Sequence, residues 1–159
     1  MTVVANAGPL IALARIGKLD LLPALYGYLL IPPAVQQETT REPELAGSAE
    51  LSSANWLHVT RVKNNAEVQR LQFWLDPGES EAIVLAQEQN ATLLMDERRG
   101  RAIAATLGLN VTGTVGILLA AKTQGHVPVV IPLLDALITA GVRISPRLYE
   151  QATQLAGEK

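Results

Sequence analysis

The sequence predicts an α/β fold of three layers, in which helices flank a mainly parallel central sheet. Short apolar segments alternate along the chain with longer segments of helical character. The short segments are apolar on both faces, which is typical of strands buried inside a parallel sheet. With 159 residues, of which 48% are hydrophobic, the chain can bury a substantial core, and we expect a single domain over residues 1–159.

Five segments are predicted to be strands because they are short and apolar, several of them with β-branched residues. Residues 56–62 alternate in strand fashion, so we expect this strand at an edge of the sheet. Asp96 follows the fourth segment directly. The predicted strands are residues 2–6, 26–31, 56–62, 93–95 and 110–113.

The predicted helices begin after proline, asparagine or an acidic residue, and several end at glycine, in accord with known capping preferences. Glu79 opens the helix that follows Pro77 and Gly78, where a carboxylate is favoured by the helix dipole. Residues 41–53 are predicted to form a loop with one or two helical turns. The predicted helices are residues 10–16, 19–25, 34–40, 68–75, a segment from 79 to 86, 101–107, 116–123, 131–138 and 146–155.

Composition limits the kinds of function that the chain can have. It contains no cysteine, which excludes disulfides and thiolate metal sites and indicates a reducing, cytoplasmic location. We expect neither a signal peptide nor a membrane span, because no apolar stretch has the required length and flanks. The net charge of −2 gives no general attraction to nucleic acid, so such binding would need a local basic patch.

Four oxygen-bearing side chains fall where the ends of predicted elements should meet: Asn6, Glu38, Glu79 and Asp96. Oxygen ligands without histidine or cysteine are those that Mg²⁺ or Mn²⁺ prefers, and such ions assist the attack of water at phosphorus. Taken singly, Glu79 also suits a helix start and Glu38 a solvated helix face. Asp96 is the strongest candidate, because a charge that ends an apolar strand must be solvated or paired.

The choice between Glu79 and Glu81 rests on helix geometry. At about 100° per residue, Glu79 shares a face with Ala82 and Ile83, whereas Glu81 points to the opposite side together with Glu88. We therefore expect Glu79 to point inward at the start of the helix.

Three arginines, Arg98, Arg99 and Arg101, lie next to Asp96. They could bind the phosphates of a polyanion, or Arg98 and Arg101 could pair with nearby acids on a helix surface, which is the commoner outcome for such a run.

The remaining polar and aromatic candidates are expected to be structural. His58 and His126 are isolated and lack the spacing of metal ligands. We expect Trp56, Phe73 and Trp74 to cover the core rather than to stack on bases. No glycine-rich phosphate-binding loop of the Walker or dinucleotide type is present.

Four segments together resemble a known family. They read VVANAGPLIAL at 3–13, PGESEAI at 77–83, LMDERRGR at 94–101 and VTGTVGIL at 111–118. In this order they resemble the PIN-like domains of the VapC toxin type, and most of all an uncharacterised PIN-like subgroup that carries a domain-of-unknown-function label.

This resemblance implies an endoribonuclease of the toxin–antitoxin type, which cleaves RNA phosphodiester bonds with Mg²⁺ or Mn²⁺. It also implies a homodimer and a small antitoxin protein as partner. The acidic positions of the family match Asn6, Glu38, Glu79 and Asp96, with Glu97 as a substitute for Asp96.

The residue at position 6 leaves two hypotheses open, because the family has an aspartate there. An amide oxygen can bind a metal, but it carries no charge and cannot act as a base. In the first hypothesis Glu38, Glu79 and Asp96 hold a catalytic metal, Asn6 completes the site, and Arg98, Arg99 and Arg101 bind RNA. In the second, the protein is a catalytically impaired PIN-like module that binds a protein or RNA.

The apolar segment 127–142 has two interpretations. It either completes the core or presents an apolar surface to a second copy of the chain or to an antitoxin. We expect a homodimer.

Overall fold

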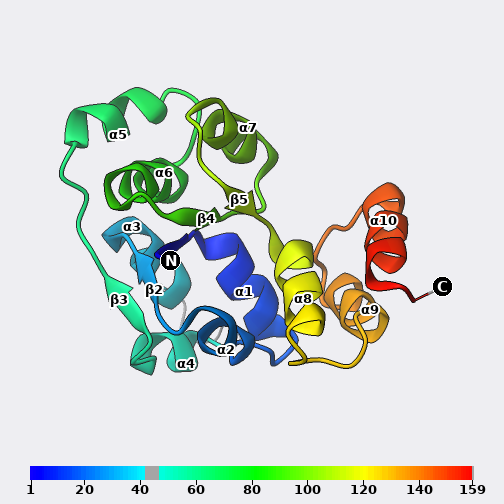
Figure 1. Cartoon of the computed structure of the whole chain (residues 1–159). Helices are drawn as coiled ribbons and strands as arrows, with labels where there is room; N and C mark the ends of the chain where they lie inside the picture. The colour runs from blue at the N-terminus through cyan, green and yellow to red at the C-terminus, as the bar shows by residue number, and fades with distance from the viewer. Residues whose placement is uncertain (42–46, 159) are drawn as a thin grey trace.

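A computed structural model describes residues 1–41 and 47–158. In these residues five strands form one parallel sheet with the order β3-β2-β1-β4-β5. They are β1 (Val3–Ala5), β2 (Leu29–Ile31), β3 (Leu57–Val59), β4 (Thr92–Leu94) and β5 (Val111–Thr112). Helices flank the sheet on both faces (Figure 1), so the predicted α/β fold is confirmed. The prediction of an edge strand near residue 58 is also confirmed, because β3 is the outermost strand.

The register of β1 and β4 sets the position of the candidate site. Val4 pairs with Leu93, and Ala5 pairs with Leu94. One residue further on, the backbone N–H of Asn6 donates to the Leu94 carbonyl at 2.9 Å. Because the two strands run parallel and end level with each other, the residues that follow them, Asn6 and Asp96, emerge at the same edge of the sheet.

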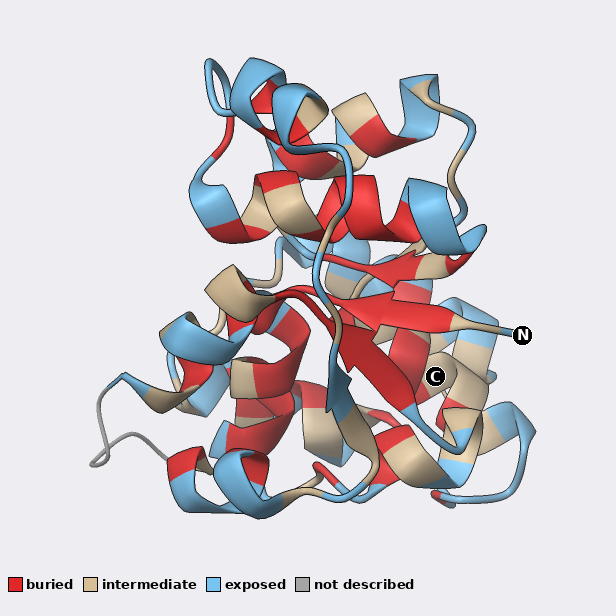
Figure 2. Ribbon diagram, turned by 90° about the vertical axis from the view of Figure 1, so that its left-hand side faces the viewer, coloured by how far each residue is buried: buried red, intermediate tan, exposed pale blue. Residues whose placement is uncertain are grey.

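Each face of the sheet is covered by its own set of helices (Figure 1). One face carries α5 (Asn65–Leu71), α6 (Pro77–Gln89) and α7 (Arg98–Thr106), and the other carries α1 (Ala7–Arg15), α2 (Leu21–Tyr26) and α8 (Thr114–Thr123). The inner strands β1 and β2 are buried throughout, whereas the edge strand β3 and the outer sides of the helices are largely exposed (Figure 2). Burial on both faces explains why β1 and β2 are apolar throughout.

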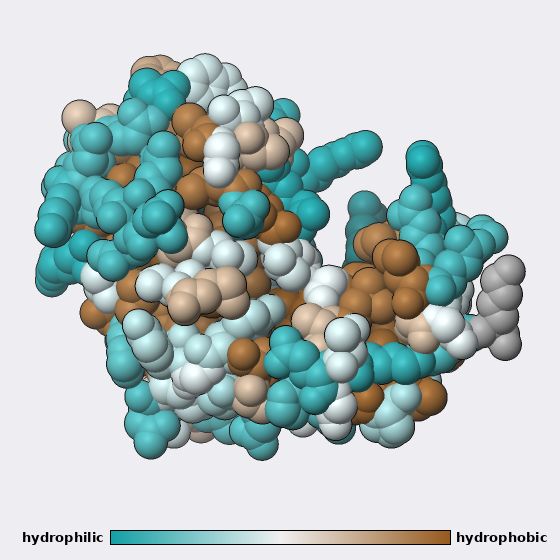
Figure 3. Space-filling model, in the orientation of Figure 1, coloured by the Kyte–Doolittle hydropathy of each residue, from teal (hydrophilic) through white to brown (hydrophobic). Residues whose placement is uncertain are grey.

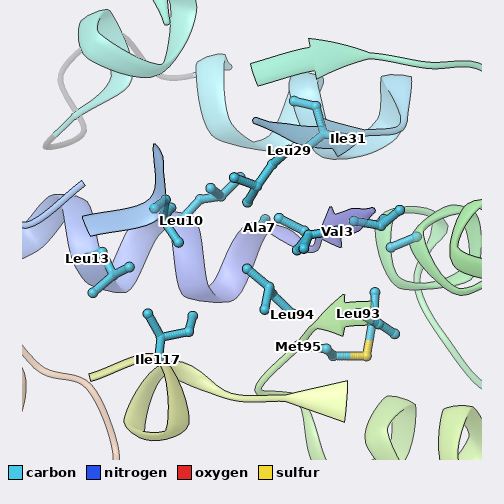
Figure 4. Close-up of a cluster of buried hydrophobic side chains, with 14 of the residues drawn as sticks. Val3, Ala7, Leu10, Leu13, Leu29, Ile31, Leu93, Leu94, Met95 and Ile117 are labelled. Atoms are coloured by element: carbon cyan, nitrogen blue, oxygen red, sulfur yellow. The ribbon is translucent and has the colours of Figure 1, made fainter. Parts of the chain in front are cut away.

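The core is built from aliphatic side chains, because the chain has only six aromatic residues. Val3, Leu93 and Leu94 from the central strands are fully buried, and they belong to one hydrophobic cluster with Leu10 and Leu13 of α1 (Figure 4). Burying a side chain of this kind contributes about 1.5–3 kcal/mol. This packing fixes the two central strands, and with them the edge at which Asn6 and Asp96 lie.

Two further helices, α3 (Pro33–Thr40) and α4 (Ser48–Ser53), connect β2 to β3. The Glu81 carboxylate on α6 accepts a hydrogen bond of 3.1 Å from the Ala34 N–H at the start of α3. Glu88 accepts hydrogen bonds from the Lys63 and Asn64 N–H groups before α5. Each of these two carboxylates satisfies free N–H groups near the start of a neighbouring helix.

Several element boundaries differ from the prediction for local reasons. The predicted strand at 26–31 is shorter, because Tyr26 ends α2 and Gly27 turns the chain at φ +78°. The α7 helix starts at Arg98 rather than residue 101, because the Glu97 carboxylate accepts hydrogen bonds from the Arg99 and Gly100 N–H groups. Of the loop predicted at 41–53, residues 42–46 lie outside the described residues. The helical turn expected in this loop is α4, at Ser48–Ser53.

Two of the aromatic residues expected over the core are exposed. Phe73 is 83% exposed and Trp74 is 52% exposed, so their predicted role in covering the core was wrong. They lie in the turn between α5 and α6, where α5 already uses Val68 and Leu71 as its buried contacts. Trp56 is only partly buried and packs against the core, as predicted.

A C-terminal arm lies outside the sheet beside α8 (Figure 1). The arm consists of α9 (Ile131–Thr139), the link 140–145 and α10 (Pro146–Ala156). Glu158 connects this arm to α8: its carboxylate accepts hydrogen bonds from the Val130 and Ile131 N–H groups and pairs with Lys122 on α8 at 2.7 Å. The Lys122 ammonium and the two N–H groups lower the Glu158 pKa to about 2. None of the described helices has the length and apolar character to cross a membrane.

We predict that Glu158→Gln lowers the thermal unfolding midpoint at neutral pH, because the charged contacts to Lys122 and to the start of α9 are lost. The Glu158 pKa is depressed on folding, so this contribution is complete above the ordinary value of 4.5 and disappears as the pH falls toward 2. Thermal melts from pH 7 to pH 2.5 should therefore show a difference that closes at low pH. Glu150→Gln, on the exposed surface of α10, is the matched control and should melt like the parent.

Candidate functional site

Asp96 follows β4 and is held by the first residue of α8. Its Oδ1 accepts a hydrogen bond of 2.7 Å from the Thr114 N–H, and its Oδ2 accepts one of 2.6 Å from the Thr114 hydroxyl. A Cβ added to Gly113 would lie 2.8 Å from Asp96 Oδ1, so the chain can pass this carboxylate only because residue 113 is glycine. Asp96 is thus fixed in position while its side chain stays open to solvent.

Asn6 lies beside Asp96 at the end of β1. Its side chain is only 6% exposed, and in the described part of the chain its Oδ1 has no hydrogen-bond partner. A buried acceptor without a donor costs about 1–3 kcal/mol. This oxygen is available to a ligand that accepts electron pairs, such as a metal ion.

The start of α6 brings further carboxylates together. Asp76 and Glu79 form a reciprocal capping box: Asp76 Oδ1 accepts from the Glu79 N–H at 2.7 Å, and Glu79 Oε1 accepts from the Asp76 N–H at 3.0 Å. Glu38 of α3 reaches the same place, because its carboxylate occupies the space that a Cβ would fill at Gly78. Three acids from two helices therefore surround the first turn of α6.

The electrostatics of these acids reflect their crowding. The pKa of Glu38 is raised by burial and by the negative charge of Asp76, against the opposing effect of Arg41. The pKa of Glu79 is also raised, first by burial and then by Asp76, Glu97 and Glu38, although its hydrogen bond from the Asp76 N–H acts in the opposite direction. Ionised carboxylates that disfavour one another are stabilised when a cation enters between them.

The predicted oxygen donors thus lie in two groups. Asn6 and Asp96 follow adjacent strands, whereas Glu38 and Glu79 lie at the start of α6 with Asp76. Within residues 1–41 and 47–158, no three acidic, histidine or cysteine side chains are placed to hold a metal ion. Binding of one ion by Glu38, Glu79 and Asp96 together therefore stays a prediction.

The donor set nevertheless fits a hard cation in its chemistry. All of these donors are oxygens, the Asn6 amide oxygen has no partner among the described residues, and the pKa values of Glu38 and Glu79 are raised by burial and, less strongly, by neighbouring negative charge. Mg²⁺ and Mn²⁺ bind ligands of this type.

Of the three arginines, Arg101 has a structural contact and the other two are exposed. The Arg101 guanidinium donates to the Met95 carbonyl at 2.9 Å and lies next to Gly113. Neither Arg98 nor Arg101 forms an ion pair with another described residue, so the pairing with nearby acids that was predicted for these two is not found there. Arg98 and Arg99 lie exposed in the first turn of α7. They remain available to an anionic ligand.

A groove between α5 and α7 lies next to these arginines. Its volume is about 560 Å³, and its lining includes Trp74, Arg99 and Ile103. Arg99 donates a long hydrogen bond of 3.5 Å to the Trp74 carbonyl, which joins the groove to the residues that lead into α6. An exposed tryptophan beside an arginine suits stacking with an unpaired base.

Sequence reasoning missed three polar residues at or near the site: Asp76, Thr114 and Arg143. Asp76 carried a signal, since the spacing Asp-x-x-Glu at 76–79 is that of a capping box. Thr114 lies within one of the segments that resemble the PIN-like family, but nothing in the sequence shows that it bonds to Asp96. Arg143 lines a cavity together with Asp96, but it lies far along the chain and carried no local signal.

We predict that Gly78→Ala weakens Mn²⁺ binding several-fold without destabilising the protein. The new methyl group takes the place of the Glu38 carboxylate, while alanine in a helix is favoured over glycine by about 0.5–1 kcal/mol. Gly8→Ala is the matched control, because its Cβ would meet Asp96 Oδ2 at an ordinary 3.6 Å. If calorimetry finds equal Mn²⁺ affinity in the parent and in Gly78→Ala, Glu38 is not a ligand.

The fold and the site define an α/β protein with acidic side chains around the carboxyl edge of a parallel sheet. The family model described as a PIN domain matches residues 2–158, and the chain belongs to this family, in a subgroup whose activity is uncharacterised. PIN domains are a nuclease-type family and generally depend on divalent metals.

Among solved structures, a PilT N-terminus domain protein from the hyperthermophilic archaeon Sulfolobus solfataricus P2 is 15% identical, with a TM-score of 0.49 over 91% of this chain and 98% of that chain. The search of curated proteins found no match.

Proposed function

We propose that this protein is a metal-dependent endoribonuclease of the toxin–antitoxin type, which cleaves RNA phosphodiester bonds. The observation that supports this most is the buried Oδ1 of Asn6, which has no partner in the described part of the chain and lies beside Asp96 at the carboxyl edge of the sheet. Such an oxygen stays without a partner until a cation binds to it.

Asn6, Glu38, Glu79 and Asp96 are the residues that would hold Mg²⁺ or Mn²⁺. The ion would supply a more acidic bound water and would stabilise the charge that develops at phosphorus. Thr114 holds the Asp96 carboxylate in place through its N–H and hydroxyl. Arg98 and Arg99 lie in the first turn of α7 and are suited to bind the RNA backbone. Arg101 donates a hydrogen bond to the carbonyl of Met95, the residue before Asp96.

The test begins with calorimetric titration of Mn²⁺ into chelator-treated protein, followed by incubation with single-stranded RNA of mixed sequence. We expect micromolar affinity, about −8 kcal/mol, and cleavage only when metal is present. Glu79→Gln is the informative variant, because glutamine can still serve in a capping box but carries no charge. It should weaken Mn²⁺ binding, whereas the control Glu150→Gln should not.

A second function is favoured by the asparagine at position 6. Without a carboxylate there, the site has one negative charge fewer than the family pattern, which weakens divalent-ion binding. In this case the protein is a catalytically impaired PIN-like module that binds a protein or RNA. Metal binding without cleavage, or RNA binding without metal, would favour this second function.

The proposed partners are a second copy of the chain and a small antitoxin. Exposed apolar side chains lie on and beside the C-terminal arm, including Val129, Ile138 and Leu155, the last of which is 78% exposed. Figure 3 shows hydrophobic surface on this side of the molecule. Sedimentation across a wide concentration range should show a dimer; a monomer throughout would contradict this part of the proposal.

A further inference from the structure

A cavity of about 320 Å³ lies between Asp96 and the C-terminal arm. Its apolar walls come from the start of α8 and from the arm, and include Val115, Leu137, Ile144 and Leu148. The start of α8 and the arm border the hollow that Figure 3 shows between the part of the molecule that contains α7 and the C-terminal arm. The volume is at the lower end of the range for small-ligand pockets, about 300–1,000 Å³, so it suits one small group rather than a helix.

The charges in this cavity are divided between its two sides. Asp96 and Glu97 lie on the sheet side, where Thr114 holds both oxygens of Asp96 and the Arg99 and Gly100 N–H groups hold the Glu97 carboxylate. Arg143, in the link between α9 and α10, is the cation of the lining. Its side chain is exposed and forms no hydrogen bond or ion pair with another described residue.

This combination matches the parts of a nucleotide. Apolar walls can enclose the faces of an unpaired base, and a guanidinium can bind a phosphate through two parallel N–H donors. A base that is paired within a duplex is not free to enter a cavity of this size. A purely apolar side chain of a partner protein would leave Arg143 without a function.

We propose that this cavity is a subsite for one unpaired nucleotide next to the phosphate that is cleaved, with Arg143 as a positioning residue that holds the phosphate of that nucleotide. The inference rests on the proposed nuclease function, because it places RNA at Asp96. The C-terminal arm then contributes to the choice of substrate, since it provides both Arg143 and most of the apolar wall.

The first experiment measures binding without turnover. A fluorescein-labelled single-stranded RNA hexamer of mixed sequence is titrated in EDTA with the parent and with Arg143→Ala, Arg143→Lys and Arg147→Ala, and binding is followed by fluorescence anisotropy. We expect Arg143→Ala to raise the Kd about tenfold, or about 1.4 kcal/mol, and Arg143→Lys to recover part of this loss. Arg147, an exposed arginine on α10, is the matched control, and its removal should change the Kd less than about twofold. Equal losses for Arg143→Ala and Arg147→Ala would mean general attraction of charge and would overturn the proposal.

A second variant tests the cavity itself. Ile144→Trp fills part of the space and should weaken the binding of the hexamer, yet have little effect on a hexamer that carries an abasic site at the subsite position. A matching loss for both hexamers, or no loss for either, would overturn the assignment of a base to the cavity.

Cleavage kinetics separate this inference from the proposed function. If the parent cleaves RNA, Arg143→Ala should raise KM with a smaller change in kcat. Unchanged KM and kcat would contradict the proposed subsite but would leave the proposed nuclease function intact. A parent that cleaves no RNA with any metal, but whose RNA binding still depends on Arg143, would lose the nuclease function and keep the subsite.

Discussion

Replacing Asn6 with aspartate is expected to strengthen Mn²⁺ binding at least about tenfold and to destabilise the chelator-treated protein. The new carboxylate would be almost fully buried, since Asn6 is 6% exposed and its Oδ1 has no partner in the described structure. A buried charge without a partner costs on the order of 3 kcal/mol. The same charge next to a divalent ion is strongly favourable, because opposite charges a few ångströms apart attract in a medium of low dielectric constant.

These two effects of Asn6→Asp can be measured on one sample. Thermal melts in EDTA and in excess Mn²⁺ should show a lower midpoint without metal and a larger gain with metal than in the parent, because a ligand that binds only the folded state stabilises it. Asn110→Asp is the matched control, because it adds the same charge at the amino end of β5, away from the site. No change in Mn²⁺ affinity would mean that position 6 does not face the metal.

The same variant also separates the two functional hypotheses. If Asn6→Asp cleaves RNA and the parent does not, this protein has the scaffold of a nuclease that has lost its activity, and the proposed function fails. If both cleave, with the variant faster at limiting Mn²⁺, the amide oxygen is a working ligand in the parent.

Replacing Asp96 with asparagine is expected to weaken Mn²⁺ binding more than tenfold and to reduce RNA cleavage at least about 100-fold, or about 2.7 kcal/mol. Asparagine has nearly the same shape, and its amide oxygen can accept the hydrogen bond from the Thr114 N–H at Oδ1. The Thr114 hydroxyl, however, can no longer donate to a second oxygen, so we expect a loss of about 1–2 kcal/mol in the free energy of unfolding.

Asp20→Asn serves as the control for this variant, since Asp20 is exposed before α2 and makes no side-chain capping bond. Binding is measured by calorimetry and cleavage by gel electrophoresis of a labelled RNA, at a temperature where urea unfolding shows both variants to be folded. An Asp96→Asn variant that binds Mn²⁺ and cleaves RNA like the parent would remove Asp96 from the site.

The sheet could be predicted because its strands are buried on both faces. Residues 93–95 and 3–5 are too short and too uniformly apolar for surface helices, and the structure places them at the centre of the sheet. Boundaries failed where a side chain decided the start of a helix. Glu97 starts α7 three residues earlier than predicted, because its carboxylate accepts hydrogen bonds from N–H groups of the first turn.

The exposure of Phe73 and Trp74 could not be predicted, because a large aromatic residue is buried in most folds and the sequence does not show which face of α5 is already occupied. For the same reason the contact of Glu81 with Ala34, 47 residues away in the chain, was missed. Contacts of this kind depend on which helices become neighbours, and local patterns do not contain that information.

The sequence by itself determined the layers of this protein and the candidate acids, because hydrophobic period and the position of a charge after an apolar strand are local properties. Only the tertiary structure decided how those acids are grouped. Parallel pairing of β1 and β4 brings Asn6 to Asp96, and the crossing of α3 and α6 brings Glu38 to Gly78 and Asp76. The cavity beside Asp96 depends even more on long-range packing, because Arg143 reaches it only when the C-terminal arm packs against α8.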